Sequence, residues 1–213
     1  MAIKAMLAKH PYLLPLEGEI RRACGIILNA VKKGNKLLLA GNGGSASDCE
    51  HMSGELLKDF MHKRPLPRPF QARLQKRFGA DGKALAESLQ YGLPAISLSS
   101  FTAFHTAFGN DICFDFSFAQ LIQALGTRGD VLICFTTSGK SKNLIYAAQV
   151  AEAKGMKVVA LTGRGGMPLK RYCDAAIDVP GSNSFSVQEG HLPVYHAICL
   201  EIEEALFRKK NPS

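Results

Sequence analysis

The chain has 213 residues, 46% of them hydrophobic and 21% charged, with a formal net charge of +8 at pH 7. This composition is typical of a globular protein with a sizeable core, and the length predicts one domain over residues 1–213. No apolar run is long enough to span a bilayer and the N-terminus has no cleavage signature, so we expect a cytoplasmic protein without a membrane partner. The six cysteines form no CxxC pair, which argues against a thiolate zinc finger.

The predicted elements alternate between helices and short apolar strands. In chain order, we expect a helix at about 17–33, a strand at 36–40, a helix from 47 to about 61, a strand at 94–98, a helix at 116–125, a strand at 130–135, a helix at about 142–154, strands at 156–161 and 175–179, and a helix at about 189–208. Repeated strand–turn–helix units predict a parallel sheet that is covered on both faces and binds ligands beyond the carboxyl ends of its strands.

A segment at about 65–91 interrupts this alternation. It begins with three prolines, which exclude a regular helix at its start, and it then predicts short helices at 70–78 and 83–89. Seven basic residues lie between Lys58 and Arg77, where Asp59 is the only acid. Few aromatic residues accompany them and the prolines break any groove-reading helix, so nucleic-acid binding is not favoured. We expect a solvated or subunit-contacting surface that can also attract anionic substrates.

Two strand-to-helix turns are rich in glycine and hydroxyl residues, namely Gly41–Ser45 and Thr136–Ser141. Glycine lets backbone amides approach an anion, and a helix N-terminus adds partial positive charge. The hydroxyls of both turns can donate to phosphate oxygens. Neither turn matches the P-loop or the GxGxxG pattern, so nucleotide binding is not favoured. The alternative is that these residues only cap the helices that follow.

Candidate metal and acid–base residues lie on two predicted helices. His51 and Glu55 are four residues apart, so both side chains lie on one helix face and can share a metal. The alternative is a histidine hydrogen-bonded to a neighbour. Gln188 and His196 are about two turns apart on the last helix and can lean into one site, with His191 as an outer residue.

Together these motifs resemble the phosphoheptose isomerase family of SIS (sugar isomerase) proteins. The resemblance rests on Gly41–Ser45, His51, Glu55, Thr137–Ser141, Lys157–Gly163, Gln188–His191 and His196, and covers roughly residues 34–206. It implies a single SIS domain, with a flavodoxin-like parallel sheet between helices and an extended N-terminal helix. It also implies a homotetramer with active sites between subunits. The implied activity is aldose–ketose isomerisation of a phosphorylated sugar, converting sedoheptulose 7-phosphate into D-glycero-D-manno-heptose 7-phosphate.

The same resemblance implies roles for individual residues. His51, Glu55, Gln188 and His196 match the ligands of one zinc ion (Zn2+) per subunit, and Glu55 and His196 match the acid–base pair. The matching substrate-binding positions are Asn42, Gly43, Gly44, Ser45, Asp111, Thr136, Thr137, Ser138, Ser141 and Gln188. The chain departs from the family in its longer segment at about 65–91 and in Phe185-Ser186, which replaces an Asp-Arg pair.

A non-catalytic SIS protein is the alternative function. The initiator-associating protein of bacterial replication has a similar scaffold, binds a protein partner and lacks an intact HxxxE pair. Here His51 and Glu55 are both present, together with Gln188 and His196, which favours an enzyme. The metal content of the protein would distinguish the two functions.

Overall fold

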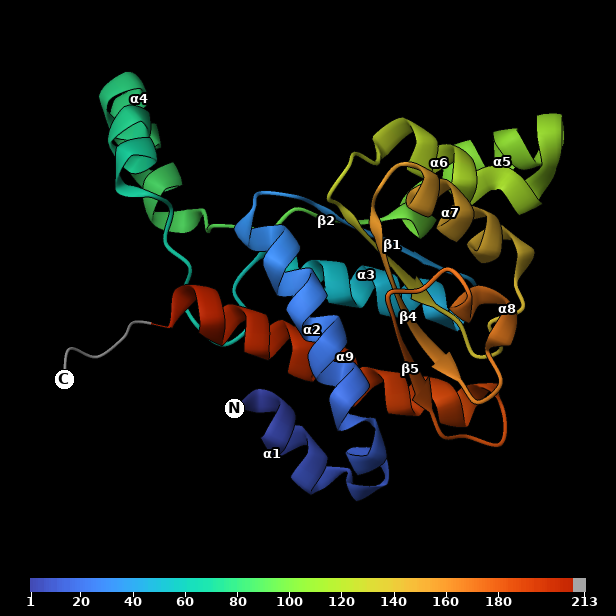
Figure 1. The fold of residues 1–213 in the computed structure, drawn as a ribbon. Coiled ribbons are helices and arrows are strands. Elements are labelled where there is room, and N and C mark those ends of the chain that lie inside the picture. Colours follow the sequence, from blue (N-terminus) through green and yellow to red (C-terminus); the bar gives the residue numbers. More distant parts are fainter. Residues whose placement is uncertain (209–213) are drawn as a thin grey trace.

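The computed structural model describes residues 1–208 and is built around a five-stranded parallel sheet (Figure 1). The strands are β1 (Leu37–Gly41), β2 (Ala95–Ser97), β3 (Val131–Phe135), β4 (Lys157–Gly163) and β5 (Ala175–Val179). Their order is β2-β1-β3-β4-β5, and every neighbouring pair is parallel. This is the flavodoxin-like order, so the predicted fold class is confirmed.

The described residues form nine α-helices, and all of them except α4 lie around the sheet. They are α1 (Ala2–Lys9), α2 (Glu17–Lys32), α3 (Gly44–Leu57), α4 (Arg68–Ser88), α5 (Thr102–Phe108), α6 (Ser117–Leu125), α7 (Lys142–Ala153), α8 (Met167–Lys170) and α9 (Ser184–Phe207). Short 3₁₀ turns lie at Pro11–Leu16, Leu98–Ser100 and Phe114–Phe116, and a π turn lies at Gly109–Cys113. Within residues 1–208, each helix is too short or too polar to cross a membrane.

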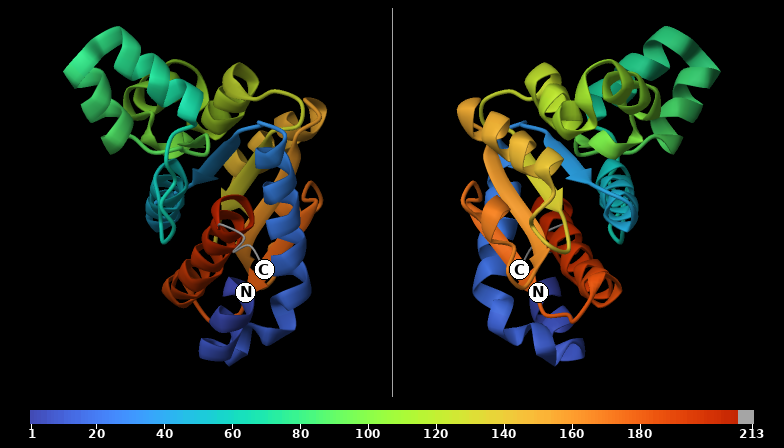
Figure 2. Two further views of the ribbon diagram at one scale, coloured as in Figure 1. Left: turned by 90° about the vertical axis from the view of Figure 1, so that its left-hand side faces the viewer. Right: turned by 90° about the vertical axis from the view of Figure 1, so that its right-hand side faces the viewer.

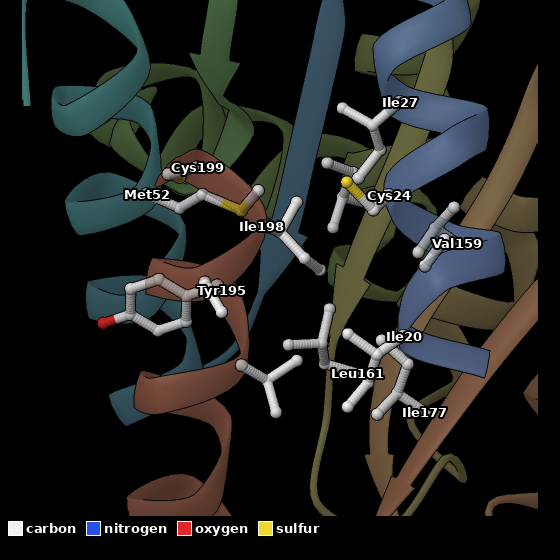
Figure 3. Close-up of a cluster of buried hydrophobic side chains, with 14 of the residues drawn as sticks. Ile20, Cys24, Ile27, Met52, Val159, Leu161, Ile177, Tyr195, Ile198 and Cys199 are labelled. Atoms are coloured by element: carbon white, nitrogen blue, oxygen red, sulfur yellow. The ribbon is translucent and has the colours of Figure 1, made fainter. Parts of the chain in front are cut away.

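The sheet separates two apolar layers because successive strand residues point to opposite faces. Leu37 and Leu39 of β1 pack with α1, α2, α3 and α9, whereas Leu38 and Ala40 pack with α6 and α7. Figure 2 shows both layers from the sides of the molecule, and Figure 3 shows side chains of α2, α3 and α9 in one apolar layer with those of β4 and β5, with α9 between the other two helices. Helices α3 and α9, which carry the candidate metal ligands, therefore share one face of the sheet.

The longer segment forms an arm that projects away from the sheet (Figures 1 and 2). The two short helices predicted there are both present within α4, which breaks at Gly79, where φ is +55°. An antiparallel bridge between Pro65 and Gln90, and a 2.7 Å hydrogen bond from Tyr91 N to Arg64 O, hold the two ends of the arm together. Because its ends are adjacent, the arm is accommodated without displacing the strands on either side.

Element boundaries differ from the prediction mainly at the two site helices. Helix α3 begins at Gly44 rather than at residue 47 and ends at Leu57 rather than near 61. Helix α9 begins at Ser184, because Asn183 and Ser186 form a reciprocal capping box, so Pro193 lies well inside the helix. Helices α1, α5 and α8 were not predicted from the sequence. The assignment of residues 1–213 to one domain stays a prediction, since residues 209–213 lie outside the described part.

Candidate active site

Helices α3 and α9 run side by side in the same direction and bring three of the four predicted metal ligands together. Near the start of both helices, Gln188 packs so closely on Gly44 that a Cβ there would lie 2.7 Å from the Gln188 amide nitrogen. About two turns further along, His51 Nε2 lies 3.4 Å from His196 Nε2 and 3.3 Å from Glu55 Oε1. Gln188 therefore lies towards the first glycine loop, and the other three predicted ligands form a cluster.

The donor chemistry of this cluster fits zinc, and its geometry fits in part. Tetrahedral zinc with bonds of about 2.1 Å separates neighbouring ligand atoms by about 3.4 Å. Both separations from His51 Nε2 are close to that value. Within residues 1–208, however, no three His, Cys, Asp or Glu side chains form a complete metal-binding group. Small side-chain rotations, and the approach of Gln188, are still required to close the site.

The cluster lies between apolar rings and one lysine. The rings of Phe60 and Tyr195 lie 5.3 Å and 5.0 Å from the His196 ring, centroid to centroid. Burial, together with the nearby His51, lowers the pKa of His196, and Glu55 opposes this shift only partly. The neutral imidazole favoured here is the form that binds a metal. Glu55 Oε2 faces Lys58 Nζ at 3.4 Å, while Oε1 faces His51.

A polar cavity of about 290 Å³ opens beside the second glycine loop. Its walls are Thr137, Ser138 and Lys140 from the second loop, Arg164 and Gly165 after β4, Gly181–Ser184 before α9, and Val187. Two cations and several hydroxyls thus face a space that no carboxylate lines. The arrangement is suited to an anion such as phosphate.

Some hydroxyls of the second loop form hydrogen bonds within the loop, whereas Ser141 does not cap the helix that follows. Thr136 Oγ1 accepts a 3.1 Å hydrogen bond from the Gly139 amide, so it stabilises the loop itself. Ser138 Oγ accepts from the Lys140 amide at 3.3 Å. Ser141 is the N-cap residue of α7, yet its side chain makes no capping hydrogen bond. The capping alternative therefore does not account for Ser141.

The first loop is joined by a pair of amides to the first turn of α7, the helix that follows the second loop. Asn42 and Asn143 donate to each other's side-chain oxygens at 3.0 and 2.9 Å. Gly43 has a φ of +57°, which favours glycine, and Ser45 is 3% exposed. Asp111, by contrast, is exposed in the π turn, where its hydrogen bond comes from the neighbouring Asn110. The structure thus joins Asn42 to the helix after the second loop, whereas the hydrogen bond of Asp111 is local.

A buried ion pair fixes the far ends of α3 and α9, and sequence reasoning missed it. Arg64 Nε lies 2.8 Å from Glu203 Oε1, and both side chains are 0% exposed. Glu203 also accepts hydrogen bonds from the backbone amides of residues 60–62, and Arg64 donates to the carbonyls of Leu56 and Glu55. The expectation of a wholly solvated or subunit-contacting basic surface is therefore wrong for Arg64, because its guanidinium caps the last turn of α3.

Comparison with known proteins decides the family. A phosphoheptose isomerase of Burkholderia pseudomallei (strain 1710b) is 37% identical over 206 residues, which cover 97% of this chain and 89% of the relative. The chain belongs to the phosphoheptose isomerase family. The SIS domain model also matches residues 97–199.

Solved structures of the family have the same fold. The phosphoheptose isomerases of Neisseria gonorrhoeae and Francisella tularensis are each 30% identical, with TM-scores of 0.74 and 0.75. Each match covers 94% of this chain and 94% or 93% of the other. The chain is accordingly a phosphosugar isomerase of the aldose–ketose type, and the non-catalytic alternative is not supported.

Proposed function

We propose that this phosphoheptose isomerase homologue interconverts sedoheptulose 7-phosphate and D-glycero-D-manno-heptose 7-phosphate, with one zinc ion per subunit. His51, Glu55 and His196 would hold the zinc together with Gln188. The observation that carries the proposal is the convergence of His51 and Glu55 of α3 with His196 of α9, the helix whose first turn also lines the anion-suited cavity. A cytoplasmic homotetramer with active sites between subunits belongs to the same proposal.

The acid–base chemistry is assigned to the side chains of the cluster. Isomerisation moves a proton between adjacent carbons through a cis-enediol, which requires a base beside the C–H bond and an acid beside the carbonyl oxygen. Glu55 takes the proton from one carbon and returns it to the next, and His196 donates to the carbonyl oxygen. Zinc, when bound, polarises the substrate oxygens and stabilises the developing negative charge.

The phosphate end of the substrate is assigned to the cavity beside the second loop. Lys140 and Arg164 supply positive charge there, Thr137 and Ser138 supply hydroxyl donors, and the α7 N-terminus adds its dipole. Holding the phosphate fixes the position of the sugar chain relative to α9, so that the reacting carbons lie beside Glu55.

Arg164→Ala is expected to raise KM for the phosphosugar about tenfold and to leave kcat nearly unchanged. The phosphate is bound equally in the ground and transition states, so loss of one charged contact of about 1.4 kcal/mol removes uniform binding. Steady-state kinetics of the zinc-loaded protein measure both constants. Arg171→Ala, which removes an exposed arginine outside the cavity walls, is the matched control. A drop in kcat without a change in KM would contradict the phosphate assignment.

An isomerase assay against a panel of ketose phosphates, with and without added zinc, tests the proposed function. The panel is needed because Phe185 is 64% exposed and Ser186 is used in the capping box, so neither side chain repeats the Asp-Arg pair of the family. We expect turnover to be highest with the seven-carbon substrate and to be lost after chelation. His51→Ala should lose bound zinc by elemental analysis. Full activity in a chelated sample would refute the metal assignment.

A further inference from the structure

The arm formed by α4 has almost no core of its own. Within α4 only Gly82 and Ala86 are buried. The two halves of the arm meet so closely at this point that a Cβ on Gly82 would collide with the Leu74 carbonyl. Short helices are marginal in water and owe most of their stability to the packing of an apolar face. The arm therefore has much to gain from a partner surface.

The exposed surface of the arm combines aromatic rings with positive charge. The Arg73 guanidinium lies 5.6 Å from the centroid of the Phe70 ring, and the Arg77 guanidinium lies 5.6 Å from that of Phe78. Phe78 is 50% exposed. Helix α4 carries five basic and two acidic residues, hence a net charge of +3. Arginine and aromatic side chains are the types enriched where proteins contact one another.

Segment 101–116, which follows β2, is a second exposed apolar surface. Its exposed large side chains are Phe101, Ile112, Phe114 and Phe116. The segment contains Asp111 and Asp115 but no lysine or arginine, so its net charge is −2. Asp115 is paired only loosely, because Lys142 Nζ lies 3.9 Å away and both side chains are exposed. The segment is thus apolar like the arm and opposite to it in charge.

A largely apolar groove of about 520 Å³ connects the two surfaces. Leu57 and Ser53 of α3 line one side of it, and Ser97 of β2 and Phe101 line the other. The arm leaves α3 after Leu57 and returns to β2, so the groove lies at its base. The hydroxyls of Ser53 and Ser97 are buried without a hydrogen-bond partner among residues 1–208. Arm, groove and segment therefore form one continuous face that is suited to a contact.

The two ends of this face are placed for a reciprocal contact. In Figure 1 the arm and α5, which is part of segment 101–116, lie at opposite ends of the upper side of the molecule. In Figure 2, a quarter-turn away, both lie on the side of β2 and opposite α2. A two-fold axis through the groove would place the arm of each copy on the segment of the other.

We propose that the arm of one copy packs, through its arginine and phenylalanine side chains, on the groove and segment 101–116 of a second copy, reciprocally about a two-fold axis. A second copy is the partner that the observations favour, because this one chain supplies both a basic apolar surface and its acidic apolar complement. A nucleic acid would use the arm but would be repelled by the segment. The contact specifies one interface of the proposed homotetramer and is independent of the isomerase reaction.

Charge reversal tests the contact, with sedimentation velocity of the full chain as the measurement. Arg73→Glu combined with Arg77→Glu makes the arm negative, and Asp111→Lys combined with Asp115→Lys makes the segment positive. The unmodified chain should sediment as an oligomer. Each variant alone brings like charges together, so we expect it to associate at least about tenfold more weakly. An equal mixture of the two variants pairs opposite charges at both contacts and should regain the association of the unmodified chain.

Arg22→Glu combined with Arg171→Glu is the control, because it reverses two exposed arginines outside this face. It should associate as the unmodified chain does, and an equal loss of association in it would overturn the inference. A mixture that stays dissociated, or an oligomer unchanged in both variants, would overturn the arm contact and leave the proposed homotetramer standing. A monomeric unmodified chain would refute both.

Circular dichroism checks that each variant folds, and the segment variant decides alone if the arm variant does not. Salt-sensitive binding of random duplex DNA, lost in the arm variant while the oligomer stays unchanged, would overturn the inference and assign the arm to nucleic acid.

Discussion

Glu55→Gln is expected to lower kcat by at least about 10²–10⁴-fold while the phosphosugar still binds. Glutamine keeps the shape of the side chain and one oxygen that can face His51, so the local packing on α3 is preserved. It has no basic oxygen at neutral pH, so the proton on the substrate carbon has no acceptor. Single-turnover assays measure the chemical step, and calorimetric titration with the phosphosugar measures binding separately.

Glu50→Gln provides the control for this substitution. Glu50 is on the same helix and accepts a 2.9 Å hydrogen bond from Ser100, away from the cluster of His51, Glu55 and His196. We expect its kcat to stay within about twofold of the unmodified chain, since exposed substitutions rarely disturb a distant site. Normal turnover by Glu55→Gln would remove Glu55 as the base. An equal loss in both variants would point to a general effect on α3.

The sheet and the two loops could be predicted because their signals are local. Each buried strand is a short apolar run, and glycine and hydroxyl residues follow β1 and β3 directly. The spacing of His51 and Glu55 likewise places both on one face of a helix, as the 3.3 Å contact confirms. The place of His196 beside them came only from the family resemblance, because no local pattern joins residues on α3 and α9.

What sequence reasoning missed depends on contacts between distant segments. Arg64 stands in a basic run that is typical of a solvated surface, and its buried partner Glu203 lies 139 residues away. Asn143 was unmarked because its pairing with Asn42 crosses 101 residues. Tyr195 was also unmarked, because only the structure shows that the hydroxyl of this core residue contacts His51 and Asp48.

Arg64→Met is expected to reduce the free energy of unfolding by about 3–5 kcal/mol. Removing the guanidinium leaves the Glu203 carboxylate buried without its countercharge and takes one donor from each of the carbonyls of Leu56 and Glu55, although Leu56 keeps the Leu93 amide as a donor. Urea unfolding followed by circular dichroism measures the change. Arg68→Met, which alters an exposed arginine at the start of α4, should stay within about 0.5 kcal/mol of the unmodified chain. A similar, small effect for both variants would show that the ion pair of Arg64 and Glu203 does not stabilise the fold.

Replacing both partners of this ion pair should not restore stability. A buried ion pair can often be exchanged for apolar residues at little cost, but here Glu203 also accepts from the amides of residues 60–62. Arg64→Met combined with Glu203→Leu would leave those partly buried amides without their acceptor, at a cost of up to about 1–3 kcal/mol each. The double variant should therefore unfold at least as easily as Arg64→Met alone. Recovery of stability would assign the whole effect to the charge pair.

The same carboxylate predicts how stability depends on pH. Burial raises the pKa of Glu203, but the amides of Phe60 and Met61 and the Arg64 guanidinium outweigh it, so the net pKa is lowered. A folded-state pKa below the unfolded value of about 4.3 stabilises the protein above that pH, and this contribution is lost as the pH falls through the folded pKa. Acid unfolding of Glu203→Gln should therefore be less steep below about pH 4.3, because its amide does not titrate. Equal slopes for the two proteins would mean that the amide and guanidinium donors do not lower the pKa of Glu203 in the folded protein.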